Sequence, residues 1–237
     1  MKKLDIIYED KEIIVCYKPA GVATQTASLG SPDMVSMLKN YLAKKGEENY
    51  LGVIHRLDQM VSGLLVFAKT KKAAAALSKQ IQDGSANKDY LALCYGVPKE
   101  KTGTLVHYMM KDPQTKLAKV IPEEKMSSEL SASYKKAILD YEVEDERENC
   151  AILKIHLQTG RFHQIRAQFA AIGNVLLGDV KYGTVQSKEF SAKEKINTVA
   201  LCAYRLVLKH PITGKDMEFV LNNKQLPNWY QKKRIEV

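Results

Sequence analysis

The 237-residue sequence has few of the features that mark disulfide-stabilised, metal-dependent or membrane-spanning proteins. Its four cysteines are widely spaced in apolar segments without a Cys-x-x-Cys pair, which predicts reduced, buried thiols in a cytoplasmic protein. No apolar run approaches the roughly 18 residues of a membrane span, and Asp5, Glu9 and Asp10 interrupt any leader-like start. The five histidines are scattered, and no P-loop or Rossmann glycine pattern occurs. We therefore expect no membrane association, no metal and no cofactor.

The composition favours a folded protein with a polyanionic partner. Hydrophobic residues make up 45% of the chain and charged residues 27%, which is enough for a sizeable core. Lys and Arg number 36 against 27 Asp and Glu, a formal net charge of +9. Nucleic acid is a common partner of such a chain. Lys and Arg side chains that bind its phosphates release the counterions condensed on them, which favours binding. The charge alone also fits an ordinary basic protein.

The apolar pattern predicts strands that often follow one another directly, with single helices between some of them. Such an order is typical of an α+β protein with a large mixed, mostly antiparallel sheet. The basic segment 107–126 is expected to form a long hairpin or loop excursion. Strands are expected at 4–8, 12–17, 88–97, 133–143 and 150–157, and helices at 71–83, from a capping Ser31 to Gly46, and from His163 to Gly173.

The most informative segment is 53–69, in which two apolar runs flank a polar group that contains His55, Arg56 and Asp58. In an extended segment the side chains of Arg56 and Asp58 leave the same face. A salt-bridged turn at the end of a strand is the purely structural interpretation. The string His-Arg-Leu-Asp, followed by Ser-Gly-Leu-Leu and Ala-Lys, closely resembles the active-site motif of the RluA family of RNA pseudouridine synthases. The resemblance implies that Asp58 is the catalytic residue.

A second motif, Thr-Gly-Arg-Phe-His-Gln-Ile-Arg at 159–166, lies where a strand should meet a helix N-terminus. Arg161, His163 and Arg166 cluster there and suit phosphate or carboxylate partners, although a capped helix with solvated arginines is the simpler interpretation. The string resembles the second motif of the same family. Leu-Gly-Asp at 177–179 and Lys-Tyr-Gly at 181–183 continue that resemblance.

Further segments extend the resemblance over nearly the whole chain, from about Leu4 to Trp229. Lys-Asp-Tyr-Leu-Ala at 88–92 resembles the family's Lys-x-Tyr-x-Ala strand, whose Tyr lies beside the catalytic Asp. We carry that role to Tyr90, although a strand Tyr is most often a core aromatic. Lys-Pro-Ala-Gly at 18–21 and His-Pro at 210–211 match an early and a late segment of the family.

The resemblance implies one catalytic domain over residues 1–237, with a sheet bent around a central RNA-binding cleft; two subdomains that share one sheet are also possible. It further implies that Asp58 acts as the nucleophile or promotes glycosidic cleavage, that Arg166 pairs with Asp58, and that Tyr90 packs on the uracil and serves as the later base. The expected partner is a stem-loop of ribosomal or transfer RNA with a flipped uridine, bound by a monomer. The expected RNA-binding residues are Lys18, His55, Arg56, Arg161, His163 and Gln164.

The chain departs from the family pattern in three respects. Val61 and Phe162 stand where the family commonly has Thr, and the Phe162 ring could stack on a base. The small S4-type RNA-binding domain that many relatives place before Lys-Pro-x-Gly is not expected here. These departures bear on substrate choice and loop order more than on activity.

Three other functions are compatible with parts of the sequence. A non-catalytic RNA-binding or assembly protein would share the charge but would not need Asp58, Tyr90 and Arg166 together. A glycoside hydrolase needs a second carboxylate facing the first, for which Asp179 is a weak candidate. A methyltransferase acting at uracil C5 needs a glycine-rich cofactor loop, and the sequence has none.

Overall fold

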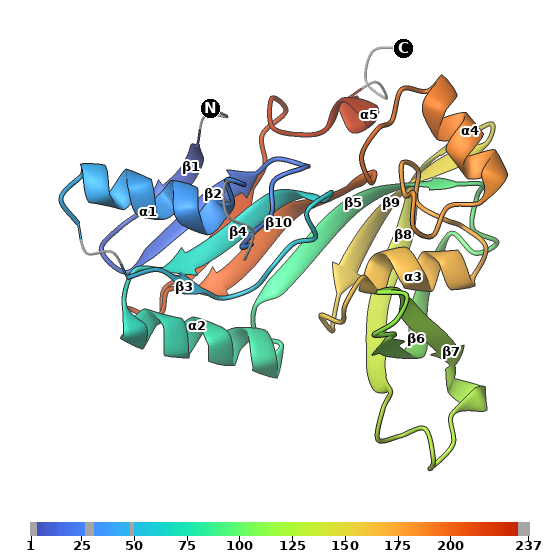
Figure 1. Ribbon diagram of the computed structural model, residues 1–237, viewed down its shortest axis with the longest axis horizontal. Helices are drawn as coiled ribbons and strands as arrows, with labels where there is room; N and C mark the ends of the chain where they lie inside the picture. Colours follow the sequence, from blue (N-terminus) through green and yellow to red (C-terminus); the bar gives the residue numbers. More distant parts are fainter. Residues whose placement is uncertain (1–3, 27–30, 48–49, 232–237) are drawn as a thin grey trace. The chain divides into compact units, whose positions relative to one another are not determined.

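The computed structural model describes residues 4–26, 31–47 and 50–231 and has the predicted α+β composition (Figure 1). The chain divides into two compact units, which we describe one at a time. Unit 1 comprises Met1–Asn87 and Ala203–Leu226, and unit 2 comprises Lys88–Cys202 and Pro227–Val237. The single catalytic domain over 1–237 stays a prediction.

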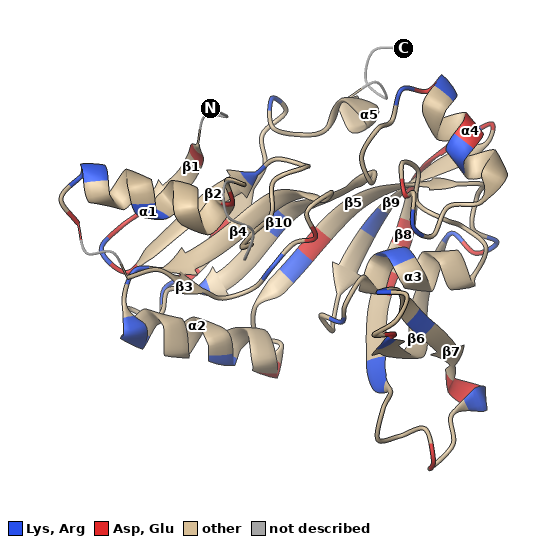
Figure 2. Cartoon of the chain, in the orientation of Figure 1, with Lys and Arg blue, Asp and Glu red and all other residues tan. Residues whose placement is uncertain are grey.

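Unit 1 is built on strands in the order β1-β2-β4-β10, with β3 beside β4 and β11 beside β10. The expected N-terminal hairpin is confirmed as an antiparallel pair of β1 with β2. Strand β4 is buried along its whole length and carries no charged residue (Figure 2), which makes it the centre of this part of the core. The strands are β1 (Asp5–Glu9), β2 (Ile13–Lys18), β3 (Gly52–Val53), β4 (Ser62–Ala68), β10 (Leu201–Lys209) and β11 (Asp216–Val220).

Two helices belong to unit 1. Helix α2 (Lys71–Asp83) has the predicted bounds, because the Thr70 hydroxyl caps its first turn and Gly84 ends it in a left-handed conformation. Helix α1 (Met34–Lys44) is confirmed, but its expected capping residue was wrong. The cap is Asp33, which forms a capping box with Ser36. The Asp33 carboxylate, two residues after Ser31, accepts from a free N–H group of the first helical turn.

Unit 2 contains strands in the order β5-β9-β8-β6-β7. Each neighbouring pair is antiparallel, and the expected excursion at 107–126 is the hairpin β6–β7 followed by one 3₁₀ turn, η1 (Glu123–Lys125). The strands are β5 (Asn87–Tyr95), β6 (Thr102–Lys111), β7 (Ala118–Pro122), β8 (Lys135–Arg147) and β9 (Cys150–Leu157), and the helices are α3 (Gln164–Ala171), α4 (Val185–Lys193) and α5 (Asn228–Gln231).

Helix α3 packs on one face of the unit 2 strands. Tyr90 of β5, Ile155 of β9 and Tyr141 of β8 lie opposite one another in register and therefore share a face. The ring of Phe169 in α3 meets the Tyr141 ring edge-on, with centroids 5.5 Å apart. This packing places α3 and Tyr90 on the same side of the unit 2 strands.

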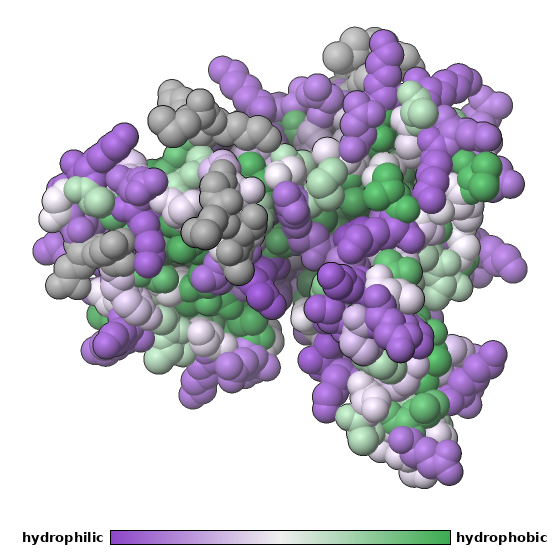
Figure 3. Space-filling model, viewed as in Figure 1, coloured by the Kyte–Doolittle hydropathy of each residue, from purple (hydrophilic) through white to green (hydrophobic). Residues whose placement is uncertain are grey.

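The face of the molecule that is visible in Figure 3 is mainly hydrophilic. Figure 3 shows hydrophilic residues over most of the visible face, with hydrophobic residues in smaller separate patches.

All four cysteines are buried free thiols. Burial raises the pKa of Cys16 and of Cys94 to about 12, so both stay protonated at neutral pH. Among the described residues, no helix is long and apolar enough to cross a membrane.

Candidate active site

Asp58 of unit 1 lies in the loop between the short strand β3 and the buried strand β4. The side chain is half-buried, and the Asp58 carbonyl accepts a 3.0 Å hydrogen bond from the N–H of Val61. This tight turn returns the chain into β4, where Gly63 has a φ of +130°. A Cβ at Gly63 would lie 2.4 Å from the carbonyl oxygen of Ala203 in β10, so the motif requires glycine there.

Two buried side chains hold this loop from inside unit 1. The Lys18 ammonium is 0% exposed and donates to the carbonyls of Val22 (2.7 Å), Gln59 (3.1 Å) and Pro19 (3.2 Å). The Thr24 hydroxyl donates to the Leu57 carbonyl and accepts from the Leu57 N–H. The charge of Lys18 therefore ties two backbone segments together, and its expected contact with RNA phosphates or a base edge stays a prediction.

His55 and Arg56 differ in exposure. His55 is half-buried, and its Nε2 accepts a 3.3 Å hydrogen bond from the N–H of Val66 in β4, which requires Nε2 to be unprotonated. Arg56 is exposed, and no other described residue pairs with its guanidinium. Of the two, Arg56 has the placement of a residue that contacts a ligand from solution.

Tyr90 of strand β5 and helix α3, which carries Arg166, lie on the same side of the unit 2 strands. Tyr90 is 6% exposed on β5 and Arg166 is 4% exposed on α3. Arg166 donates from Nε to Oδ2 of Asp179 at 2.6 Å and from Nη2 to Oδ1 at 2.8 Å. Such a two-pronged pair fixes the plane of the guanidinium. The predicted pairing of Arg166 with Asp58 stays a prediction.

Asp179, in the Leu-Gly-Asp segment at 177–179, is a structural anchor of unit 2. It is 2% exposed, and its Oδ1 also accepts from the backbone N–H groups of Lys181 and Tyr182. A carboxylate so fully bonded to its own unit does not suit the second acid of a glycoside hydrolase. The Arg166 guanidinium also lies 5.3 Å from the centre of the Tyr182 ring.

Gln164 and His163 were expected to bind RNA, but both point into unit 2. Gln164 is 4% exposed; its Oε1 accepts from the Thr159 hydroxyl and the Arg161 N–H, and its Nε2 donates to the Ile138 carbonyl. His163 is 8% exposed, with its Nδ1 2.9 Å from the Tyr182 hydroxyl. Gln164 therefore stabilises the loop before α3, and its expected contact with RNA stays a prediction.

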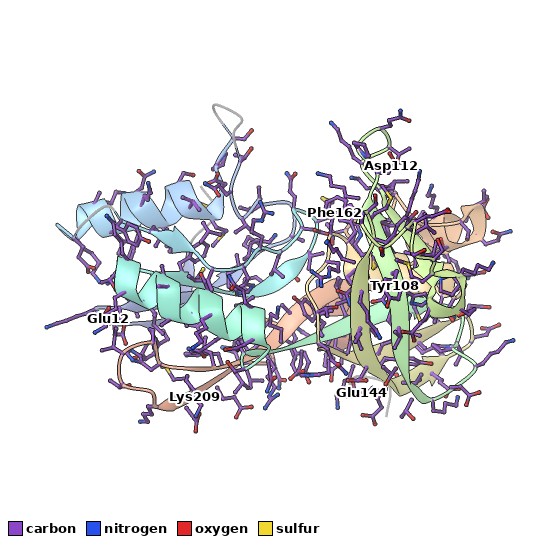
Figure 4. The ribbon with its side chains drawn as sticks, turned by 90° about the horizontal axis from the view of Figure 1, so that it is seen from below. Glu12, Tyr108, Asp112, Glu144, Phe162 and Lys209 are labelled. Carbon is purple, nitrogen blue, oxygen red and sulfur yellow. The ribbon has the colours of Figure 1, made fainter. Side chains whose placement is uncertain are left out.

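Arg161 and Phe162 form the exposed part of the second motif. Arg161 is exposed and anchored by one hydrogen bond from Nε to the Lys136 carbonyl (2.9 Å). Phe162 is 37% exposed and stacks on the His163 ring with centroids 3.8 Å apart, and the Lys111 ammonium lies 4.9 Å from the Phe162 ring centre. Figure 4 shows Phe162 on the same side of unit 2 as the end of β6. Within the described ranges, no group of three or more His, Cys, Asp or Glu residues could hold a metal ion.

Comparison with known proteins identifies the class to which this fold and these motifs belong. The model of the RNA pseudouridylate synthase family matches residues 12–171, and the chain belongs to this family. It is similar to the ribosomal large subunit pseudouridine synthase D of Zymomonas mobilis, with 32% identity over 91% of this chain and 68% of that protein. An uncharacterized RNA pseudouridine synthase of Bacillus subtilis is 30% identical over 90% of this chain and 66% of its own length. The chain thus spans about two thirds of the length of these relatives.

The same fold occurs in solved structures. Human RNA pseudouridylate synthase domain containing 4 has a TM-score of 0.74 at 20% identity, covering 95% of this chain and 90% of that one. Human RNA pseudouridylate synthase domain containing 1 has a TM-score of 0.73 at 22% identity, covering 95% and 86%. These likenesses confirm the predicted fold class. The bend of the sheet and the central cleft stay predictions.

Proposed function

We propose that this protein isomerises particular uridines of RNA to pseudouridine. In this reaction the bond from ribose C1′ to uracil N1 breaks and a bond from C1′ to C5 forms, while C5 loses a proton and N1 gains one. Atoms and electrons balance within the nucleotide and solvent, so no oxidant or second substrate is needed. One observation carries the proposal: the family match spans the three predicted catalytic residues, and unit 2 holds Tyr90 and Arg166 on one face.

We assign the chemistry to Asp58, as the nucleophile or as the group that promotes cleavage. Arg166 is proposed to orient Asp58; a guanidinium has five N–H donors, of which Asp179 takes two. Tyr90 is proposed to pack on the uracil and to remove the C5 proton. Attack on the sugar and attack on the base would use the same residues.

The target uridine must leave its stack, which costs a few kcal/mol. Arg56 is proposed to fill the gap or hold the displaced strand, since it is exposed and has no partner among the described residues. Arg161 is proposed to contact phosphates. The proposed substrate is a stem-loop of ribosomal or transfer RNA, bound by a monomer in the cytoplasm, and the four buried thiols suit a reducing compartment.

The test is release of tritium from RNA transcribed with uridine labelled at C5. We expect the wild-type protein to release label without any added cofactor, and Asp58→Asn to lower the rate by ~10³-fold or more. The matched control is Asp216→Asn, which removes a charge from the same unit at a side chain that is 82% exposed, and should leave the rate within about twofold.

Two results would contradict the proposal. Turnover at the wild-type rate by Asp58→Asn would remove the catalytic assignment. Absence of release by the wild-type protein from both ribosomal and transfer RNA, together with tight salt-sensitive binding, would indicate a non-catalytic RNA-binding protein.

A further inference from the structure

Lys88, at the start of strand β5, is a partly buried cation with no anionic partner among the described residues. None of the other residues that the structure describes gives its ammonium a hydrogen bond or an ion pair. The adjacent carboxylate of Asp89 does not compensate it, because successive residues of a strand point to opposite faces. Asp89 instead lies 2.6 Å from Nδ1 of His156, which is opposite it in register on β9.

The ammonium of Lys88 is aimed at the loop of the second motif. A Cβ built on Gly160 would lie 3.7 Å from Nζ of Lys88, so the missing side chain at this exposed position leaves the cation uncovered. Lys88 also shares a strand face with Tyr90, two residues further on. The exposed guanidinium of Arg161 follows Gly160 directly.

An uncompensated cation that has lost part of its water is costly, and natural proteins usually pair such groups. Burial lowers the pKa of Lys88 from its usual value. Removal of the charge should therefore cost the fold nothing, which indicates that the charge serves a ligand.

We propose that Lys88, together with Arg161 beside the gap at Gly160, binds a backbone phosphate of the substrate strand near the target nucleotide. This inference rests on the proposed function, since it takes the ligand to be RNA. The chemistry fits, because an ammonium on a flexible stem is a point charge that suits a phosphodiester oxygen. Tyr90 on the same face would then meet the base that belongs to this stretch of backbone.

The test compares Lys88→Met, which removes the charge at similar length, with Lys99→Met as the matched control. Lys99 is an exposed lysine of unit 2 in the turn after β5. With a stem-loop RNA, we expect Lys88→Met to weaken binding about 10- to 100-fold at low salt. The slope of the logarithm of the association constant against the logarithm of the salt concentration is negative, and its magnitude should decrease by about 1. Lys88→Arg should keep most of the affinity, and Lys99→Met should change neither quantity.

Gly160→Leu supplies a second variant, because its side chain would cover the ammonium without removing it. It should weaken RNA binding in the same direction as Lys88→Met. Lys88→Met should unfold at the same urea concentration as the wild type or at a higher one. A lower urea midpoint for Lys88→Met would overturn the assignment, as would an unchanged dependence of its RNA binding on salt. A fall in kcat for this variant, with KM and RNA affinity unchanged, would also overturn it.

The outcomes separate this inference from the proposed function. Uridine conversion by the wild type, with binding by Lys88→Met unchanged, removes the phosphate site and leaves the enzyme activity standing. Weakened binding by Lys88→Met, with no conversion by the wild type, removes the proposed activity and leaves the phosphate site standing.

Discussion

The buried pair of Arg166 and Asp179 allows a quantitative test of how unit 2 holds its guanidinium. Asp179→Ala removes a carboxylate that accepts from Arg166 at 2.6 and 2.8 Å and from two backbone N–H groups at 3.0 and 3.2 Å. The side chains are 5% and 0% exposed, so water cannot replace the lost acceptor. Breaking such a pair costs about 3–5 kcal/mol, because the buried guanidinium loses the carboxylate that holds it with two hydrogen bonds.

A matched surface pair provides the control. Nε of Arg205 lies 2.6 Å from Oε1 of Glu218, the same distance as in the buried pair, but the side chains are 35% and 54% exposed. Glu218→Ala should therefore cost less than about 1 kcal/mol. For a protein of this size 1 kcal/mol corresponds to about 2–4 °C in Tm, so the expected losses are about 6–20 °C for Asp179→Ala and below about 4 °C for Glu218→Ala.

Urea unfolding and thermal melting at pH 7 measure both variants. The double variant Arg166→Met with Asp179→Leu should recover part of the lost stability, because the buried guanidinium is removed together with the carboxylate. It should release no tritium from RNA if Arg166 also serves the reaction. Equal losses for Asp179→Ala and Glu218→Ala would refute the argument from burial.

Two further predictions concern unit 1. Burial raises the pKa of Glu9, but hydrogen bonds from two lysines and a tyrosine outweigh it and lower the pKa from 4.5 to about 2. The stabilisation that ionised Glu9 gives the fold is therefore complete above about pH 4.5 and is lost as the pH falls toward 2 and below. Glu9→Gln should lower the free energy of unfolding in urea by about 1–2 kcal/mol at pH 7, and this loss should disappear as the pH falls through 2. A loss that does not depend on pH would contradict this prediction. Gly63→Ala should cost about 2–4 kcal/mol because its Cβ meets the backbone of Ala203, whereas Gly84→Ala, also at positive φ but with nothing within 4 Å, should cost about 1 kcal/mol. Similar urea midpoints for these two glycine variants would show that strand β10 yields to the added methyl group.

Local patterns in the sequence were sufficient for the elements and motifs whose signals lie close together in the chain. Helix α2 follows from apolar residues at four-residue spacing ended by a glycine, and the β1–β2 hairpin from two apolar runs around a polar turn. The capping residue of α1 was missed, because Ser31 and Asp33 offer competing caps within one turn. The family assignment came from contiguous strings around Asp58 and Arg166, which need no knowledge of the fold.

The direction and partners of side chains were decided by tertiary structure. Lys18 reads as a basic residue near a motif, but it donates to Gln59, 41 residues away in the chain, and so holds the Asp58 loop from inside. Arg166 forms a buried ion pair with Asp179, 13 residues away in the chain, and the exposed Arg161 lies near the buried Gln164. The sequence alone therefore determined the class of protein and the residue types of its site. Which polar groups are spent within the protein and which face a ligand depends on distant segments packing together, because a buried group must find its hydrogen-bond partner wherever the fold supplies one.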